Sequence, residues 1–124
     1  MATVVTDVGM GIITNRIKGS GTEPNYLAWG TGTNTAAAAD TALQTASAEA
    51  RVAGTSSREE TNVANDTYRV VGTLTSAGNQ TIAEAGLFDA STTGNCFVRG
   101  DFSGVALAVD ESIEFTVDVV FDQE

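Results

Sequence analysis

Residues 112–121 read Ser-Ile-Glu-Phe-Thr-Val-Asp-Val-Val-Phe, and this stretch decides the fold class. Glu114, Thr116 and Asp118 alternate with apolar side chains. Successive side chains of a β-strand point to opposite faces, so the alternation predicts a strand with one packed face and one wet face. The packed face is expected to hold Ile113, Phe115, Val117, Val119 and Phe121.

Similar patterns precede this strand. Thr67 to Thr75 alternates in the same way, and Thr81 to Phe88 offers Ile82 and Leu87 as core residues. Shorter apolar runs predict further strands at 26–29, 96–102 and 105–109, and an exposed edge strand is an option within 54–65. Roughly seven to nine short strands with frequent turns are typical of an antiparallel sandwich or barrel. We therefore expect an all-β, jelly-roll-like sandwich over residues 26–124.

The composition excludes several functions. The 124 residues carry a formal net charge of -10, from 16 acidic and 6 basic residues. Such a surface repels phosphate, so nucleic acid is not an expected partner. Histidine is absent and Cys96 is the only cysteine, which removes the usual general base, an intrachain disulfide and a thiolate metal cluster. We expect a chain that is not an enzyme and needs no cofactor or metal, with Cys96 as a small buried hydrophobe.

Targeting signals are also missing from the pattern. The chain has no continuous apolar run of about 18 residues, so no membrane span is expected. The first residues lack the apolar core of a secretory signal. The sequence therefore predicts a protein assembled in a cytoplasm.

Residues 1–25 differ from the rest and are interpreted as an extended N-terminal arm. Glycines at 9, 11, 19 and 21 interrupt the apolar residues, and this density argues against a stable helix. The segment is either the first part of the core sheet or an arm that reaches a neighbouring subunit. In the second case its binding residues would be Val4, Val5, Val8, Met10, Ile12, Ile13 and Ile17.

A few acidic residues are candidates for chemistry. Glu84 and Asp101 are expected on neighbouring strands, where they form either a carboxylate pair or ordinary exposed positions. Acidic residues at 110, 111, 118 and 122 have no spacing typical of a calcium loop. The Gly30–Thr33 run lacks the Gly-Lys-Ser/Thr ending of a phosphate loop.

Three large side chains are candidates for a subunit interface. Trp29 is expected to anchor either the core or an interface. Arg69 and Arg99 are expected on outward-facing positions, either in cross-strand ion pairs or at an interface. Between these elements, residues 36–43 are rich in alanine, with Asp40 as the candidate cap of one helical turn, and a short helix is an option from Thr45 onward.

The order of several short motifs resembles a known group of proteins. The motifs are Tyr26-Leu27-Ala28-Trp29-Gly30-Thr31-Gly32-Thr33, Asp40-Thr41-Ala42-Leu43, Glu49-Ala50-Arg51, Ile82-Ala83-Glu84-Ala85-Gly86-Leu87-Phe88-Asp89-Ala90 and Asp110-Glu111-Ser112-Ile113-Glu114-Phe115. Together they cover residues 26–121 and are similar to capsid decoration (cement) proteins of tailed bacteriophages, and more loosely to domains of phage tail fibres. Each motif alone is of low specificity.

The resemblance implies a virion protein. It implies a homotrimer on the outer capsid surface that contacts the major capsid protein and stabilises the shell by clamping adjacent subunits. It carries over no catalytic residue and no cofactor. The alternatives are a phage tail component, such as a fibre base or adaptor, and a glycan-binding or hydrolytic module.

Overall fold

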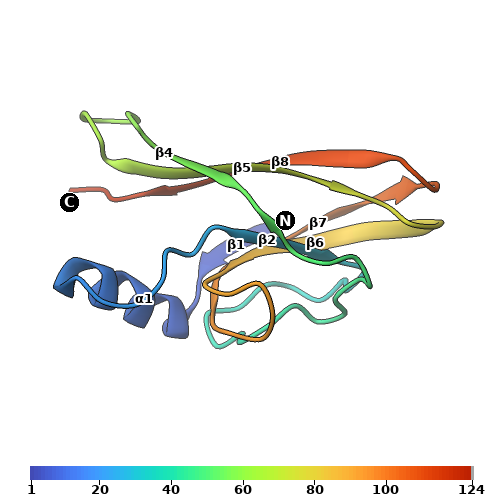
Figure 1. Cartoon of the computed structure of the whole chain (residues 1–124), viewed down its shortest axis with the longest axis horizontal. Helices are drawn as coiled ribbons and strands as arrows, with labels where there is room; N and C mark the ends of the chain where they lie inside the picture. The colour runs from blue at the N-terminus through green and yellow to red at the C-terminus, as the bar shows by residue number, and fades with distance from the viewer. Residues whose placement is uncertain (124) are drawn as a thin grey trace.

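The computed structural model describes residues 1–123 as two packed antiparallel β-sheets with one helix beside them (Figure 1). The predicted all-β antiparallel sandwich is confirmed. The elements are β1 (Ala2–Val5), α1 (Asp7–Lys18), β2 (Tyr26–Gly30), β3 (Val52–Ala53), β4 (Thr55–Glu59), β5 (Thr67–Thr75), β6 (Gln80–Phe88), β7 (Cys96–Leu107) and β8 (Ser112–Val120).

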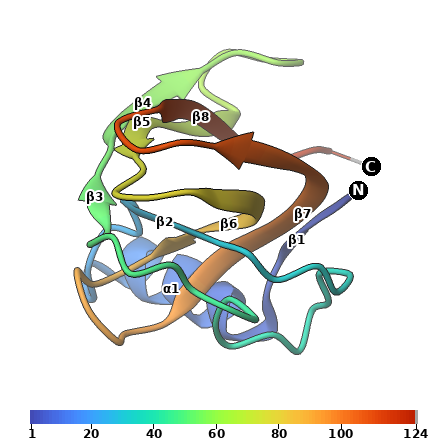
Figure 2. The same cartoon turned by 90° about the vertical axis from the view of Figure 1, so that its right-hand side faces the viewer.

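The strands divide between a five-stranded and a three-stranded sheet. Sheet A has the order β1-β7-β6-β2-β3, and sheet B has the order β4-β5-β8. Between β3 and β4 the chain passes from sheet A to sheet B, and a single residue, Gly54, links the two strands. On the opposite side of the sandwich, the long strand β7 curves towards β8 (Figure 2). No helix in residues 1–123 is long and apolar enough to cross a membrane.

The core lies between the sheets and follows the predicted alternation. In β5, Val70 and Leu74 are buried, and they pair across the ladder with Val117 and Ile113 of β8. Ile82 and Leu87 are fully buried in β6, as predicted. Burial of each such aliphatic side chain contributes roughly 1.5–3 kcal/mol. Phe121 departs from the prediction, because β8 ends at Val120 and the Phe121 side chain is 50% exposed.

The N-terminal segment is not the extended arm that the glycine content suggested. Residues 2–5 form β1, which pairs with β7, and residues 7–18 form α1. The Thr6 hydroxyl caps α1 by accepting a bond from the Gly9 amide at 2.9 Å. Gly19 ends the helix in the left-handed conformation, with φ 90°. Two of the four glycines therefore have a role in the helix, Gly9 as a buried position and Gly19 as its end.

The alanine-rich stretch contains no helix. Residues 31–51 form an irregular loop beside sheet A, with one isolated bridge between Gly30 and Ala46. Asp40 accepts a bond from the Ala37 amide at 2.8 Å, which closes a turn of the loop. Within this stretch the amides of Gln44 and Thr45 are bonded to Glu84, as described below.

Candidate functional site

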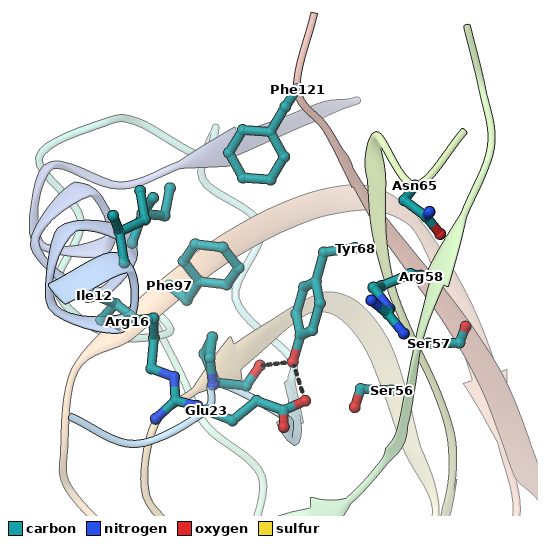
Figure 3. A pocket seen from close by; sticks show the side chains of 13 residues that line it. Ile12, Arg16, Glu23, Ser56, Ser57, Arg58, Asn65, Tyr68, Phe97 and Phe121 are labelled. Carbon is teal, nitrogen blue, oxygen red and sulfur yellow. Dashed lines mark hydrogen bonds between the residues drawn. The ribbon is translucent and has the colours of Figure 1, made fainter. Parts of the chain in front are cut away.

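A groove of about 840 Å³ lies between α1 and the inner face of sheet B; we call it the helix groove (Figure 3). Helix α1 lies at one end of the sandwich, where it faces sheet B in place of further strands of sheet A (Figure 1). Ile12, Tyr68 and Phe97 form the buried or half-buried floor of the groove. The remaining lining residues are Ile13, Arg16, Ile17, Glu23, Pro24, Ser56, Ser57, Arg58, Asn65 and Phe121.

The β4 wall of this groove is polar where a sandwich strand is usually apolar. Ser56 is opposite Val70 and Arg58 is opposite Tyr68 in the β4–β5 ladder, so both side chains share the inner face of sheet B. Arg58 is nevertheless exposed. This end of the inner face is therefore not closed by the chain's own core.

Tyr68 is fixed at the base of the groove. Its hydroxyl lies 2.9 Å from Glu23 Oε2 and 3.3 Å from the Pro24 carbonyl oxygen, both of which are acceptors. Burial and the bond to Glu23 raise the pKa of Tyr68 above its ordinary value. Tyr68 therefore stays protonated near neutral pH and acts as a positioned hydrogen-bond donor.

The helix groove also holds positive charge that the chain leaves unpaired. Within residues 1–123, the ion pairs are made by Arg69 and Arg99 alone. Arg16 donates only to the Gly21 carbonyl, at 3.0 Å, and no carboxylate lies within ion-pair distance of Arg16 or Arg58 in this part of the chain. Two of six basic residues thus face one groove of a strongly acidic chain.

A second surface is the open side of the sandwich, which we define as the unpaired edges of β8 and of residues 102–107 of β7. Strand β1 pairs with β7 only at residues 98–101, and β8 ends the order of sheet B within the described residues. Phe102 and Phe115 meet here with ring centroids 6.1 Å apart, yet both are only partly buried. Val105 shares the face of buried Ile82 and is 42% exposed. The open side therefore leaves apolar core residues half covered.

Trp29 and Arg99 are both buried within the subunit, which is the core alternative for Trp29 and the ion-pair alternative for Arg99; only the exposed position expected for Arg99 is wrong. Trp29 is 1% exposed, and its indole nitrogen donates to Glu49 Oε1 at 2.9 Å. Arg99 is 1% exposed because the loop that carries Asn34 and Asp40 covers it, on the face of sheet A that its neighbour Val98 turns away from. Arg69 does lie on the outer face of sheet B, where its Nε is 2.8 Å from Asp118 Oδ1.

Arg99 belongs to a buried ionic cluster that fixes the 31–47 loop. Its Nη2 lies 2.9 Å from Glu84 Oε1 and its Nη1 lies 2.8 Å from Asp40 Oδ2. Glu84 also accepts bonds from the amides of Gly32, Gln44 and Thr45, at 2.8–2.9 Å. Burial opposes ionisation, but these amides and Arg99 hold the pKa of Glu84 below its ordinary value.

The same cluster shows what Glu84 does in place of forming a carboxylate pair with Asp101. Glu84 and Asp101 are opposite one another in the β6–β7 ladder, as neighbouring strands predicted. Asp101 accepts the Ala2 amide at 2.6 Å, and this bond lowers its pKa. Both oxygens of Glu84 are occupied by the loop and Arg99. Both carboxylates therefore make structural contacts, Glu84 with the loop and Arg99, and Asp101 with the Ala2 amide of β1.

The seven residues predicted to form a binding arm differ in exposure, because the segment forms a strand and a helix rather than an arm. Ile12 is buried, whereas Met10 is 55% exposed and Ile17 is 83% exposed. The other four are partly buried, with Val4 and Val5 in β1 and Val8 and Ile13 in α1. Only Ile13 and Ile17 join Ile12 at the groove.

The remaining expectations concern a metal site and Cys96, and the groove residues lie outside every expectation. Within residues 1–123, no group of three or more acidic or cysteine residues is arranged to hold a metal ion. Cys96 is fully buried, as predicted, and burial raises the pKa of its thiol to about 11. The groove residues Tyr68, Glu23 and Arg58 were not predicted as a site, and the sequence gives a signal only for Arg58, which lies in the polar stretch 55–59.

Comparisons with protein-family models, with curated proteins and with solved structures find no match, so function is inferred from this chain's own residues.

Proposed function

We propose that the chain is a decoration (cement) protein of a tailed-bacteriophage virion. It binds the outer capsid as a homotrimer and stabilises the shell by clamping adjacent subunits of the major capsid protein. The motif order over residues 26–121 supports this assignment, as does an all-β sandwich with two uncovered surfaces.

The open side is the single observation that carries the proposal. Unpaired strand edges invite pairing with another chain, and soluble proteins normally shorten, charge or cover them. Here the nine residues of β8 and residues 102–107 of β7 lie uncovered, beside half-buried Phe102 and Phe115. Contact between copies covers both the edges and the apolar residues. Three copies form a closed ring when one surface of each copy contacts a different surface of the next.

The helix groove and α1 supply the surface that remains for the shell. Met10 and Ile17 are exposed on α1, and Phe121 is exposed at the groove. A trimer presents three copies of this surface, so a modest contact per copy gives stable attachment through avidity. The clamp thus uses a docked helix rather than an extended arm.

Antibody labelling of purified virions tests the proposal. Label over the capsid faces is the expected result. Label confined to the tail would replace the proposal with a tail component, and virions without label would overturn it. Measurement of the mass in solution tests the trimer separately, since a chain that stays monomeric at all concentrations contradicts clamping by a trimer.

A further inference from the structure

We propose that the helix groove binds an extended, acidic segment of a partner protein, with apolar side chains on the floor and carboxylates at the rim. This inference deepens the proposed function, since it rests on a capsid subunit as the natural source of the segment. The chemistry of the groove itself is independent of that source.

The apolar part of the argument comes from the floor and its margins. Ile12, Tyr68 and Phe97 are covered by the chain, but Ile17 and Phe121 at the margins are 83% and 50% exposed. Apolar residues beside an open groove of about 840 Å³ leave contact area that water fills in the free chain. Binding sites of this size commonly combine apolar walls with a few polar groups that orient the ligand.

The charge argument selects the partner. Arg16 extends from α1 and Arg58 from β4, so the two guanidinium groups approach the groove from opposite walls (Figure 3). Glu23 is the one acidic lining residue, and it is bonded to the Tyr68 hydroxyl. The groove therefore has a positive balance, and guanidinium groups favour carboxylates as bidentate partners.

The shape argument favours a chain over a compact ligand. The groove lies between a helix and a strand and is open to solvent rather than an enclosed cavity. Side chains of an extended segment alternate between two faces. One face then meets the apolar floor, while the other carries carboxylates at the level of the exposed arginines.

Nuclear magnetic resonance titration of the full chain tests the inference with a defined peptide. The probe is acetyl-Asp-Leu-Asp-Phe-Asp-Gly-amide, and its charge-reversed counterpart carries Lys in place of each Asp. We expect saturable shifts of the amides of Ile13, Ile17, Tyr68 and Phe97 with the acidic peptide only. The double variant Arg16→Gln/Arg58→Gln should weaken binding at least about tenfold, because it removes charge-assisted hydrogen bonds.

Arg69→Gln is the matched control. It removes one guanidinium from the opposite face of the same sheet, so the affinity for the acidic peptide should be unchanged. Ile17→Asn removes an exposed apolar margin residue and should weaken binding without a loss of folded-state stability.

Four results of the binding measurements would overturn the inference. They are no saturable shift at millimolar acidic peptide, equal binding of the lysine peptide, equal loss in Arg69→Gln, and binding of dodecanoate at these amides without binding of the peptide. If copies of the chain associate and the groove variants abolish this association, the groove binds a second copy and the inference is likewise overturned.

The virion and peptide experiments separate the two proposals. If virions carry the chain but the peptide does not bind, only the groove inference is wrong. If the peptide binds but virions lack the chain, only the capsid assignment is wrong.

Discussion

Gly9 of α1 packs so closely against β7 that a Cβ atom at Gly9 would stand 2.5 Å from the carbonyl oxygen of Phe97. The neighbouring Thr6 side chain strengthens this contact, because its hydroxyl donates to the Cys96 carbonyl at 2.6 Å. A glycine that appeared to oppose a helix is thus required for the helix to dock. The docked helix in turn forms one wall of the helix groove.

Gly9→Ala should destabilise the chain by about 1–3 kcal/mol, because an added methyl group forces α1 away from a backbone atom that cannot yield. Gly11→Ala is the control in the same helix, since nothing lies within 4 Å of a Cβ there. It should stabilise the chain by about 0.5–1 kcal/mol through helix propensity. Urea unfolding measures both, and a Gly9→Ala variant as stable as Gly11→Ala would contradict the packing.

Breaking the buried ionic cluster should cost far more than breaking a surface pair. Arg99→Met leaves the buried Glu84 carboxylate without its counter-ion and should destabilise the chain by about 3–5 kcal/mol. Arg69→Met removes the exposed pair with Asp118 and should cost about 0–1 kcal/mol. The double variant Glu84→Gln/Arg99→Met should cost less than the sum of its single variants. Equal costs for Arg99→Met and Arg69→Met would show that the cluster does not fix the loop.

Acid should weaken the fold through Glu49. The Ala77 amide lowers the pKa of Glu49 to about 2 from 4.5, against the opposing effect of burial and with help from Gln80 and Trp29. A carboxyl group with a lowered folded-state pKa contributes stability that is complete above its unfolded pKa. That contribution should be lost as the pH falls from about 4.5 to about 2. Titration of the Glu49 carboxyl carbon by nuclear magnetic resonance checks the value, and Glu49→Gln should flatten this part of the stability profile. A Glu49 that titrates at its ordinary value would contradict these bonds.

Val105→Lys should dissociate the proposed trimer and leave the subunit folded. The side chain is 42% exposed in the free chain, so lysine is tolerated there but places charge in the contact between copies. Val63→Lys is the control, since Val63 is 52% exposed in the loop between β4 and β5. Light scattering should give the mass of one chain, 12.7 kDa, for the first variant and three times that mass for the second. A Val105→Lys protein that stays trimeric would move the interface away from the open side.

The strands were predictable because their side chains follow a local rule. The predicted strands β5, β6 and β8 lie within one residue of their observed bounds, and the edge strand that was an option within 54–65 is β4 at Thr55–Glu59. The helix was missed because glycine content was weighed above its end signals, which are Thr6 before the first turn and Gly19 after the last. Those signals are local and were available in the sequence.

The site was not predictable to the same degree, because it depends on contacts between distant residues. The burial of Arg99 follows from its bonds to Glu84, Asp40 and Asn34, two of which lie in the loop that covers it. The groove needs Glu23 beside Tyr68, which are 45 positions apart. Periodicity within a single strand carries no information about such contacts.

The most direct test of the decoration assignment is the copy number of the chain in purified virions, measured by quantitative mass spectrometry against the major capsid protein. A protein that clamps the whole shell should be present in a number comparable with that of the capsid subunits. A few copies per virion, as expected of a tail component, or none at all, would contradict the account.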